Sequence, residues 1–266
     1  MKYVMMFFLF CLSLNASVYY SKVEPFQTYT IKAAASGKVL YADENAEGKI
    51  SKGKVLVQLD DVLAKQELKS SYEKLKSMKS MMEITKKSIE NAKIIAKIRE
   101  ENYNKIKFLK TKSRVDKDNE LITAVNAKDV VLNLENTLES LNTQVNDQIY
   151  KIETLKDQIQ KKKIIVQKDF LIYKLYVRNN DYVNVGTQIV DAYDVSKGKL
   201  TVFVSKDDYN SAKNGVIYIN DKKTSYKIDK LWKASDSENI SSYKAEILIN
   251  APKLFSKLVK IEFKAK

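Results

Sequence analysis

A long stretch without glycine or proline constrains this chain more than any other feature. The 266-residue sequence has six glycines and two prolines, and none of them falls between Lys54 and Val185. Because glycine and proline mark most turns, this interval predicts long, uninterrupted secondary structure. About half of the chain is therefore expected to form one extended unit, with turn-rich segments on either side.

Apolar residues in the second part of this interval follow a heptad pattern. Over 124–159 they recur at alternating spacings of three and four residues, as in the seam of a coiled coil. A weaker row with a spacing of seven residues runs over 68–103. The pattern predicts two helices of nearly equal length, over about 61–109 and 114–163.

Only a short connection separates the two predicted helices. Ser113 suits the N-cap of the second helix, and Asp116 favours the positive end of its dipole. A short connection makes the helices antiparallel neighbours, each roughly 70 Å long at ~1.5 Å per residue. The interval 61–163 is therefore predicted to be an antiparallel coiled-coil hairpin.

The segments on either side of this hairpin are β-like and share a short repeat. Residues 48–57 and 181–190 both read as a strand, a glycine turn and a second strand, with Gly53 matching Gly186. Each copy is too short to bury a core by itself, so we expect the two copies to pack together. Such packing joins the two ends of the hairpin.

The last part of the chain predicts short strands and one short helix. The helix is expected over 205–214, with Ser205 as its N-cap and Gly215 just beyond its end. Alternation of apolar and polar residues is clearest near the C-terminus. Together these elements predict a small β-barrel. The expected strands are 200–204, 216–219, 226–231, 243–249 and 259–263.

Residues 1–16 read as a secretory signal peptide. Lys2 precedes an apolar run over 4–14, which is far shorter than the ~20 residues of a membrane span. Cleavage after Ala16 would remove Cys11, the single cysteine of the chain. The alternative is an uncleaved anchor at the membrane interface. Either way, the protein is expected to be exported and at most peripheral to a membrane.

The composition excludes several classes of enzyme and metal site. The formal net charge is +14, and the chain has no histidine, which removes histidine-based dyads, triads and metal ligands. No phosphate-binding loop, nucleophile elbow or metal-ligand spacing is present. The lysines lie along the predicted coiled coil without the aromatic interleaving of a nucleic-acid surface. We therefore expect no enzyme, no cofactor, no metal and no nucleic-acid partner.

The order of these parts resembles the periplasmic adaptor family, also called membrane fusion proteins or hemolysin-D-like proteins, of tripartite efflux pumps and type I secretion systems. The resemblance starts near Tyr29 and rests on half-motifs at 35–60 and 169–194 around two equal helices. It implies an α+β fold, in which a coiled-coil hairpin is inserted in a lipoyl-like barrel-sandwich hybrid domain and a small β-barrel follows. The implied parts are a signal peptide at 1–16, a lead and first lipoyl-like half at 17–60, the hairpin at 61–163, the second half at 164–196 and the barrel at 197–266.

The family marks its hairpin tip with arginine, then leucine four residues later and serine seven residues after that. In this sequence the spacing falls on Asn102, Ile106 and Ser113. The serine matches, isoleucine replaces leucine, and Asn102 departs from the family pattern. The resemblance implies that these three residues contact an outer-membrane channel. The alternative is that Ser113 is only an N-cap and Ile106 only a seam residue.

The resemblance also implies a function. The chain would be a non-enzymatic periplasmic adaptor that links an inner-membrane transporter to an outer-membrane channel, in a ring of subunits that often numbers six in the family. One alternative is a stand-alone exported coiled-coil scaffold or binding protein. Another is a carrier-domain enzyme subunit, although export and the helical insertion argue against a lipoyl or biotinyl group.

Overall fold

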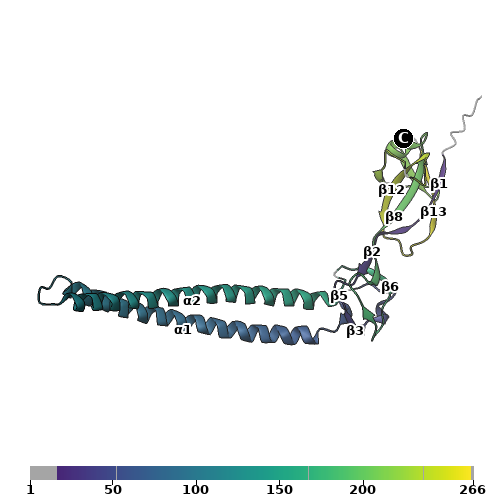
Figure 1. The fold of residues 1–266 in the computed structure, drawn as a ribbon. Coiled ribbons are helices and arrows are strands. Elements are labelled where there is room, and N and C mark those ends of the chain that lie inside the picture. Colours follow the sequence, from purple (N-terminus) through teal and green to yellow (C-terminus); the bar gives the residue numbers. More distant parts are fainter. Residues whose placement is uncertain (1–16, 52, 167, 236, 265–266) are drawn as a thin grey trace, which may run out of the picture.

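The molecule is elongated, with a helical hairpin that projects from one small β body and a second β body beyond the first (Figure 1). This computed structural model describes residues 17–51, 53–166, 168–235 and 237–264. The predicted signal peptide lies outside the described residues. No helix in the described part of the chain combines the length and apolar character needed to cross a bilayer.

The two predicted helices are confirmed as an antiparallel pair. Helix α1 spans Val62–Ile106 and helix α2 spans Arg114–Lys161, and the two lie side by side along their lengths (Figure 1). The heptad seam of α2 is buried or half-buried throughout, as its spacing predicts. The fully buried members are Ala124, Val131, Leu141, Val145, Gln148, Ile152 and Leu155.

The seam of α1 contains small and polar residues that the apolar pattern did not include. Ser71 is buried together with Ile89, Ala92 and Ala96. The amide Nε2 of Gln148 donates a hydrogen bond of 3.2 Å to the backbone carbonyl of Ser71. This bond gives the buried amide of Gln148 a partner in the seam.

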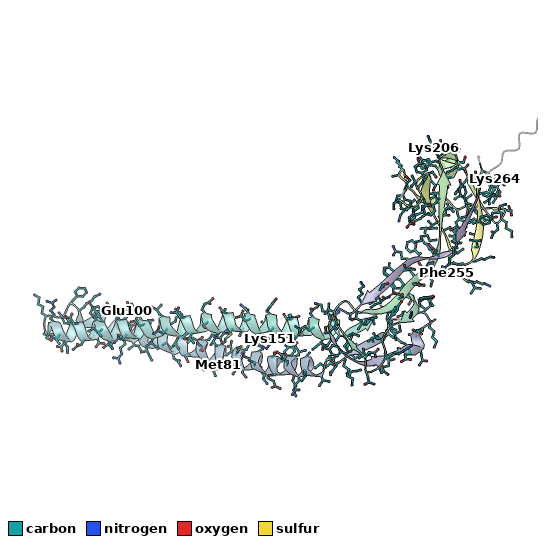
Figure 2. The ribbon with its side chains drawn as sticks, turned by 45° about the vertical axis from the view of Figure 1, so that its right-hand side comes forward. Met81, Glu100, Lys151, Lys206, Phe255 and Lys264 are labelled. Carbon is teal, nitrogen blue, oxygen red and sulfur yellow. The ribbon has the colours of Figure 1, made fainter. Side chains whose placement is uncertain are left out.

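Ion pairs along the outside of the seam join the two helices. Lys93 pairs with Glu135 at 2.7 Å, Lys128 with Glu100 at 2.8 Å, and Lys151 with Glu67 at 2.8 Å. Figure 2 shows Glu100 toward the tip of the hairpin and Lys151 nearer its base. Exposed pairs of this kind each contribute only ~0.2–1 kcal/mol, so they add to the seam packing without replacing it.

The first β body closes the base of the hairpin. Its sheet has the order β5-β4-β3-β7, and β4 pairs antiparallel with β5, with Val57 opposite Ile164. Strand β4 leads into α1 and β5 follows α2, so this pairing holds the two ends of the hairpin together. The strands are β3 (Gly37–Ala42), β4 (Val55–Leu59), β5 (Lys163–Ile165) and β7 (Tyr182–Val183).

The core of this body combines residues from before and after the hairpin, as the repeat predicts. Val39 and Leu56 from the first segment share one buried cluster with Ile172 and Ile189 from the second. The two matched glycines, Gly53 and Gly186, both have positive φ, at 71° and 87°. That backbone conformation favours glycine, so the matching turns of the repeat are confirmed.

The second β body has a separate core and contains the sheet β1-β13-β9-β10. The remaining sheet, β11-β12-β8-β2, runs through both bodies, and β6, which pairs with the first part of β8, belongs to the first body. Buried Leu200, Ile217, Ile247 and Ile261 belong to this core. A closed barrel stays a prediction. The strands are β1 (Val18–Lys22), β2 (Glu24–Lys32), β6 (Leu171–Leu175), β8 (Gln188–Ser205), β9 (Val216–Ile219), β10 (Lys222–Lys223), β11 (Ile228–Leu231), β12 (Ser242–Asn250) and β13 (Leu258–Lys264).

Two local features of this body differ from the sequence-based expectation. The predicted helix over 205–214 is shorter: α3 spans Tyr209–Asn214 with Asp208 at its N-cap. The Ser205 hydroxyl instead accepts a hydrogen bond of 3.2 Å from the backbone N–H of Asp208 in the turn before the helix. The N-terminal segment also forms strand β1, which pairs with β13. A single edge strand without a clear alternating pattern gives little sequence signal.

Asp191 ties together the strands that run between the two β bodies. Its carboxylate accepts hydrogen bonds from Thr30 on β2 at 2.8 Å, from Tyr176 at 2.7 Å and from Gln188 at 3.0 Å. Burial by itself raises the pKa of this carboxyl, but the hydrogen bonds from Tyr176, Thr30 and Gln188 outweigh burial and hold the pKa below its usual value.

The lowered pKa of Asp191 predicts acid-sensitive stability. Because the folded pKa lies below the unfolded one, Asp191 stabilises the fold at pH values above the unfolded pKa of about 4, and this stability is lost as the pH falls through the folded pKa. The Asp191→Asn variant should therefore lose less melting temperature between neutral and acidic pH than the unmodified protein. Scanning calorimetry at several pH values gives the melting temperatures of both proteins. An equal fall in melting temperature with pH for the two proteins would contradict this role.

Leu141 tests the continuity of α2. A Leu141→Pro variant removes a backbone donor in the middle of the helix and should cost ~3 kcal/mol or more. A Leu141→Ala variant, which keeps the helix and loses only seam packing, should cost ~2–5 kcal/mol. Circular dichroism should show a loss of helix content in the proline variant and nearly full helix content in the alanine variant. Equal helix content in both variants would contradict a continuous α2.

Candidate functional site: the hairpin tip

The hairpin tip is built by a helix end, a short connection and a well-capped helix start. Helix α1 ends at Ile106, and α2 begins at Arg114 with Ser113 as its N-cap. The Ser113 hydroxyl accepts a hydrogen bond of 3.1 Å from the backbone N–H of Asp116, and the Asp116 carboxylate accepts one of 3.3 Å from the N–H of Ser113. This capping box confirms the predicted N-cap and fixes where the chain turns back.

The structure brings two of the three predicted tip residues together. Asn102 and Ile106 lie one turn apart on α1, both half-buried, and both line a surface groove of about 470 Å³. Ser113 is exposed, lies outside that groove and uses its hydroxyl in the cap. Lys112 and Asp116 on either side of Ser113 do line the groove. A contact role for Asn102, Ile106 and Ser113 stays a prediction.

Sequence reasoning missed the most exposed apolar side chains of the tip. Phe108 is 82% exposed, and Leu109 and Val115 are also exposed. The Nζ of Lys107 lies 5.0 Å from the centre of the Phe108 ring. Two adjacent apolar residues inside a lysine-rich connection were a usable signal, because a connection has no seam that could bury them. Exposed apolar residues at the end of a rod are typical of a docking surface.

The tip is also strongly basic. From Asn102 to Val115 the chain has four lysines and one arginine but no acidic residue. These positive charges surround Phe108 and Leu109 along the connection. The combination of an exposed apolar centre and a basic rim suits a partner surface that offers apolar grooves and acidic side chains.

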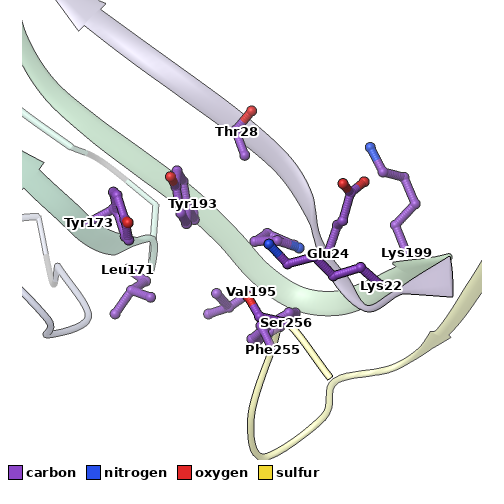
Figure 3. A pocket seen from close by; sticks show the side chains of 11 residues that line it. Lys22, Glu24, Thr28, Leu171, Tyr173, Tyr193, Val195, Lys199, Phe255 and Ser256 are labelled. Carbon is purple, nitrogen blue, oxygen red and sulfur yellow. The ribbon is translucent and has the colours of Figure 1, made fainter. Parts of the chain in front are cut away.

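A second candidate is a cavity of about 380 Å³ between the two β bodies. The rings of Tyr173 and Tyr193 stack there with their centres 4.6 Å apart, and Glu24 and Lys199 project from paired strands across from them (Figure 3). The cavity lies where β2 and β8 run from one body to the other, beside a register shift after Pro25. The lining therefore combines an aromatic pair on one side with charged side chains on the other.

A search for metal-ligand groups does not add a third location. Among the residues that the structure describes, no group of three or more aspartate, glutamate, histidine or cysteine side chains is placed to hold a metal ion. The tip has a groove, exposed apolar side chains and positive charge, and these features can take part in binding.

Comparison with known proteins identifies the fold. No protein-family model and no curated protein matches the chain. The solved structure of MacA from Actinobacillus actinomycetemcomitans matches with a TM-score of 0.74 and 19% identity, covering 93% of this chain and 78% of that one. The membrane fusion protein Spr0693 from Streptococcus pneumoniae R6 matches with a TM-score of 0.58 and 12% identity, covering 94% of this chain and all of that one.

A third structure is a MacA–MexA chimera that carries the α-hairpin domain of Pseudomonas aeruginosa MexA. It matches with a TM-score of 0.56 and 17% identity, covering 94% of this chain and 82% of that one. The hairpin and the flanking β bodies therefore have the arrangement seen in these solved structures, one of which is named a membrane fusion protein. This chain has their fold, which confirms the resemblance drawn from the sequence.

The cap at Ser113 can be tested apart from any partner. A Ser113→Ala variant loses the hydroxyl that satisfies the Asp116 N–H and should lose about 1 kcal/mol of stability. Hydrogen exchange should accelerate in the first turn of α2 and stay unchanged in the rest of that helix. Thr111→Ala, in the same connection, is the control and should leave exchange in α2 as it is. Equal exchange in both variants would contradict the cap.

Proposed function

We propose that this protein is a periplasmic adaptor that links an inner-membrane transporter to an outer-membrane channel in an efflux or secretion pump. The hairpin tip would meet the channel, and the two β bodies would meet the transporter. Several copies would stand in a ring, so that the exported compound passes along the assembly. The protein would reach the periplasm through the signal peptide predicted at its N-terminus.

The single observation that supports this proposal most is a rod with a distinct tip. Each helix is about 70 Å long by its residue count, and the strand pairing at the base holds both ends in one β body. Such a rod separates two binding regions by a fixed distance. The tip has exposed Phe108 and a basic connection. These features suit an end that docks on a partner, and a protein without partners would not need them.

Co-purification tests the role. An affinity-tagged full chain, cross-linked in living cells and then solubilised in detergent, should capture both an outer-membrane channel and an inner-membrane transporter. Deletion of the gene should raise sensitivity to some toxic compounds, and the unmodified gene should restore resistance. Capture of neither membrane protein, with no change in sensitivity, would contradict the adaptor role and favour a stand-alone scaffold.

Ile106 tests the tip contact within that experiment. An Ile106→Asp variant places a charge in the tip groove, where the side chain is only partly buried and lies at the end of α1, so it should fold with nearly full helix content and capture less channel. Capture of the transporter should stay as it is, because the β bodies are unchanged.

The matched control for Ile106→Asp is Ile84→Asp. This residue is also on α1 but lies far from the tip, and its side chain is exposed. The control should leave capture of the channel unchanged. Unfolding of the Ile106→Asp variant would show that Ile106 acts mainly in the seam, and equal channel capture by both variants would contradict the tip contact.

A further inference from the structure

The cavity between the two β bodies has walls from both of them. Leu171 and Tyr173 come from β6 of the first body. Lys22 comes from β1 of the second body, and Phe255 comes from the loop before β13. The volume of about 380 Å³ lies in the range of small-molecule sites, about 300–1,000 Å³, and such sites favour interfaces between domains. Size and position therefore both suit a small ligand.

One wall of the cavity is aromatic and can accept a planar ligand. The rings of Tyr173 and Tyr193 stack with their centres 4.6 Å apart and 16° between their planes. Stacking covers one face of each ring, and Tyr173 is still 58% exposed. The apolar side chains of Leu171, Val195 and Phe255 line the cavity beside this pair. An aromatic ring would therefore find both a stacking partner and apolar surface here.

The opposite wall is charged, with more positive than negative groups. Lys22, Lys199 and Glu24 project from it (Figure 3). Glu24 lies opposite Lys199 in the register of β2 and β8, whereas Lys22 lies opposite the apolar Leu258 in the register of β1 and β13. Within the described ranges, the charged groups of these three side chains form no ion pair or hydrogen bond. The ammonium groups are therefore available to bind an anionic group.

The loop that forms part of the charged side is held in place without a ligand. The backbone N–H of Ser256 donates to the carbonyl of Val23 at 2.8 Å, and the N–H of Val23 donates to the carbonyl of Lys257 at 2.9 Å. Ser256, which lines the cavity, has a φ of 68°. This left-handed conformation is uncommon for residues other than glycine, and such residues cluster at ligand-binding sites. A preformed wall loses little freedom when a ligand binds.

We propose that this cavity binds a small aromatic anion, with an aromatic carboxylate as the simplest example. The ring lies against the Tyr173–Tyr193 pair, and the carboxylate accepts hydrogen bonds from Lys22 and Lys199. Because the ligand contacts both β bodies, its binding also restricts movement of one body relative to the other. The site is separate from the hairpin tip, and the proposal does not depend on the adaptor role.

Binding of naphthoate to the purified full chain tests the ligand class. Titration calorimetry should detect binding of naphthoate. Neutral naphthylmethanol and cationic naphthylmethylamine should bind at least about tenfold more weakly, because neither supplies an anionic acceptor to the lysines. No binding of naphthoate at concentrations up to about 1 mM would overturn the proposal. Equal or tighter binding of the alcohol or the amine would also overturn it.

Lysine variants test whether the ligand binds at this wall. The double variant Lys22→Gln with Lys199→Gln should weaken naphthoate binding by about tenfold or more, because two charge-assisted hydrogen bonds are lost. The matched control is Lys174→Gln with Lys197→Gln, which removes the same charge from exposed residues of β6 and β8 that do not line the cavity. The control should keep the affinity of the unmodified protein. Equal losses in the two double variants would indicate general attraction to a basic protein and would overturn the site.

A tyrosine variant and hydrogen exchange test the aromatic wall. Tyr193→Leu keeps an apolar side chain but removes the ring, and should weaken naphthoate binding by about two- to tenfold. In the unmodified protein, saturating naphthoate should slow exchange over residues 22–28 and 254–257 and leave the hairpin tip unchanged. Unchanged exchange in both segments would overturn the proposal. This readout and the lysine variants stay decisive even if Tyr193→Leu unfolds, because neither uses that substitution.

Discussion

The rest of the structure depends on the pairing of β4 with β5 at the base of the hairpin. Antiparallel strands lie about 4.8 Å apart, and the backbone N–H of Leu59 donates to the carbonyl of Lys162 at 2.8 Å where the chain leaves and re-enters the β body. This pairing brings two helices that are distant in sequence to one point. From there, the seam and the ion pairs between the helices keep them together up to the tip.

This arrangement places the hairpin tip and the two β bodies at opposite ends of a rod. The β bodies hold their cores at one end, and Phe108 and its basic surroundings lie at the other. The stiffness between these ends comes from many weak contacts along the seam, since no single buried residue dominates it. A protein built in this way is suited to position partners, which agrees with the fold it shares with the membrane fusion proteins.

Much of the fold could be predicted, and the misses have physical causes. The helices followed from the heptad rows and the absence of glycine and proline, because these patterns depend only on local geometry. Ser71 was missed because a search for apolar residues leaves out a polar residue that is buried in the seam. The start of α3 was placed too early because the Ser205 hydroxyl caps a turn before the helix. Phe108 was overlooked although its place beside Leu109 in a short lysine-rich connection was a usable signal.

The sequence by itself determined the two equal helices, the cap at Ser113 and the matching glycine turns, since each is set by residues close together in the chain. Only the tertiary structure decided that β1 joins the C-terminal sheet, that Asn102 and Ile106 share a groove without Ser113, and that Gln148 meets the backbone of Ser71 across the seam. These facts depend on the register between distant segments. Register is set by side chains that meet only after the chain has folded back on itself.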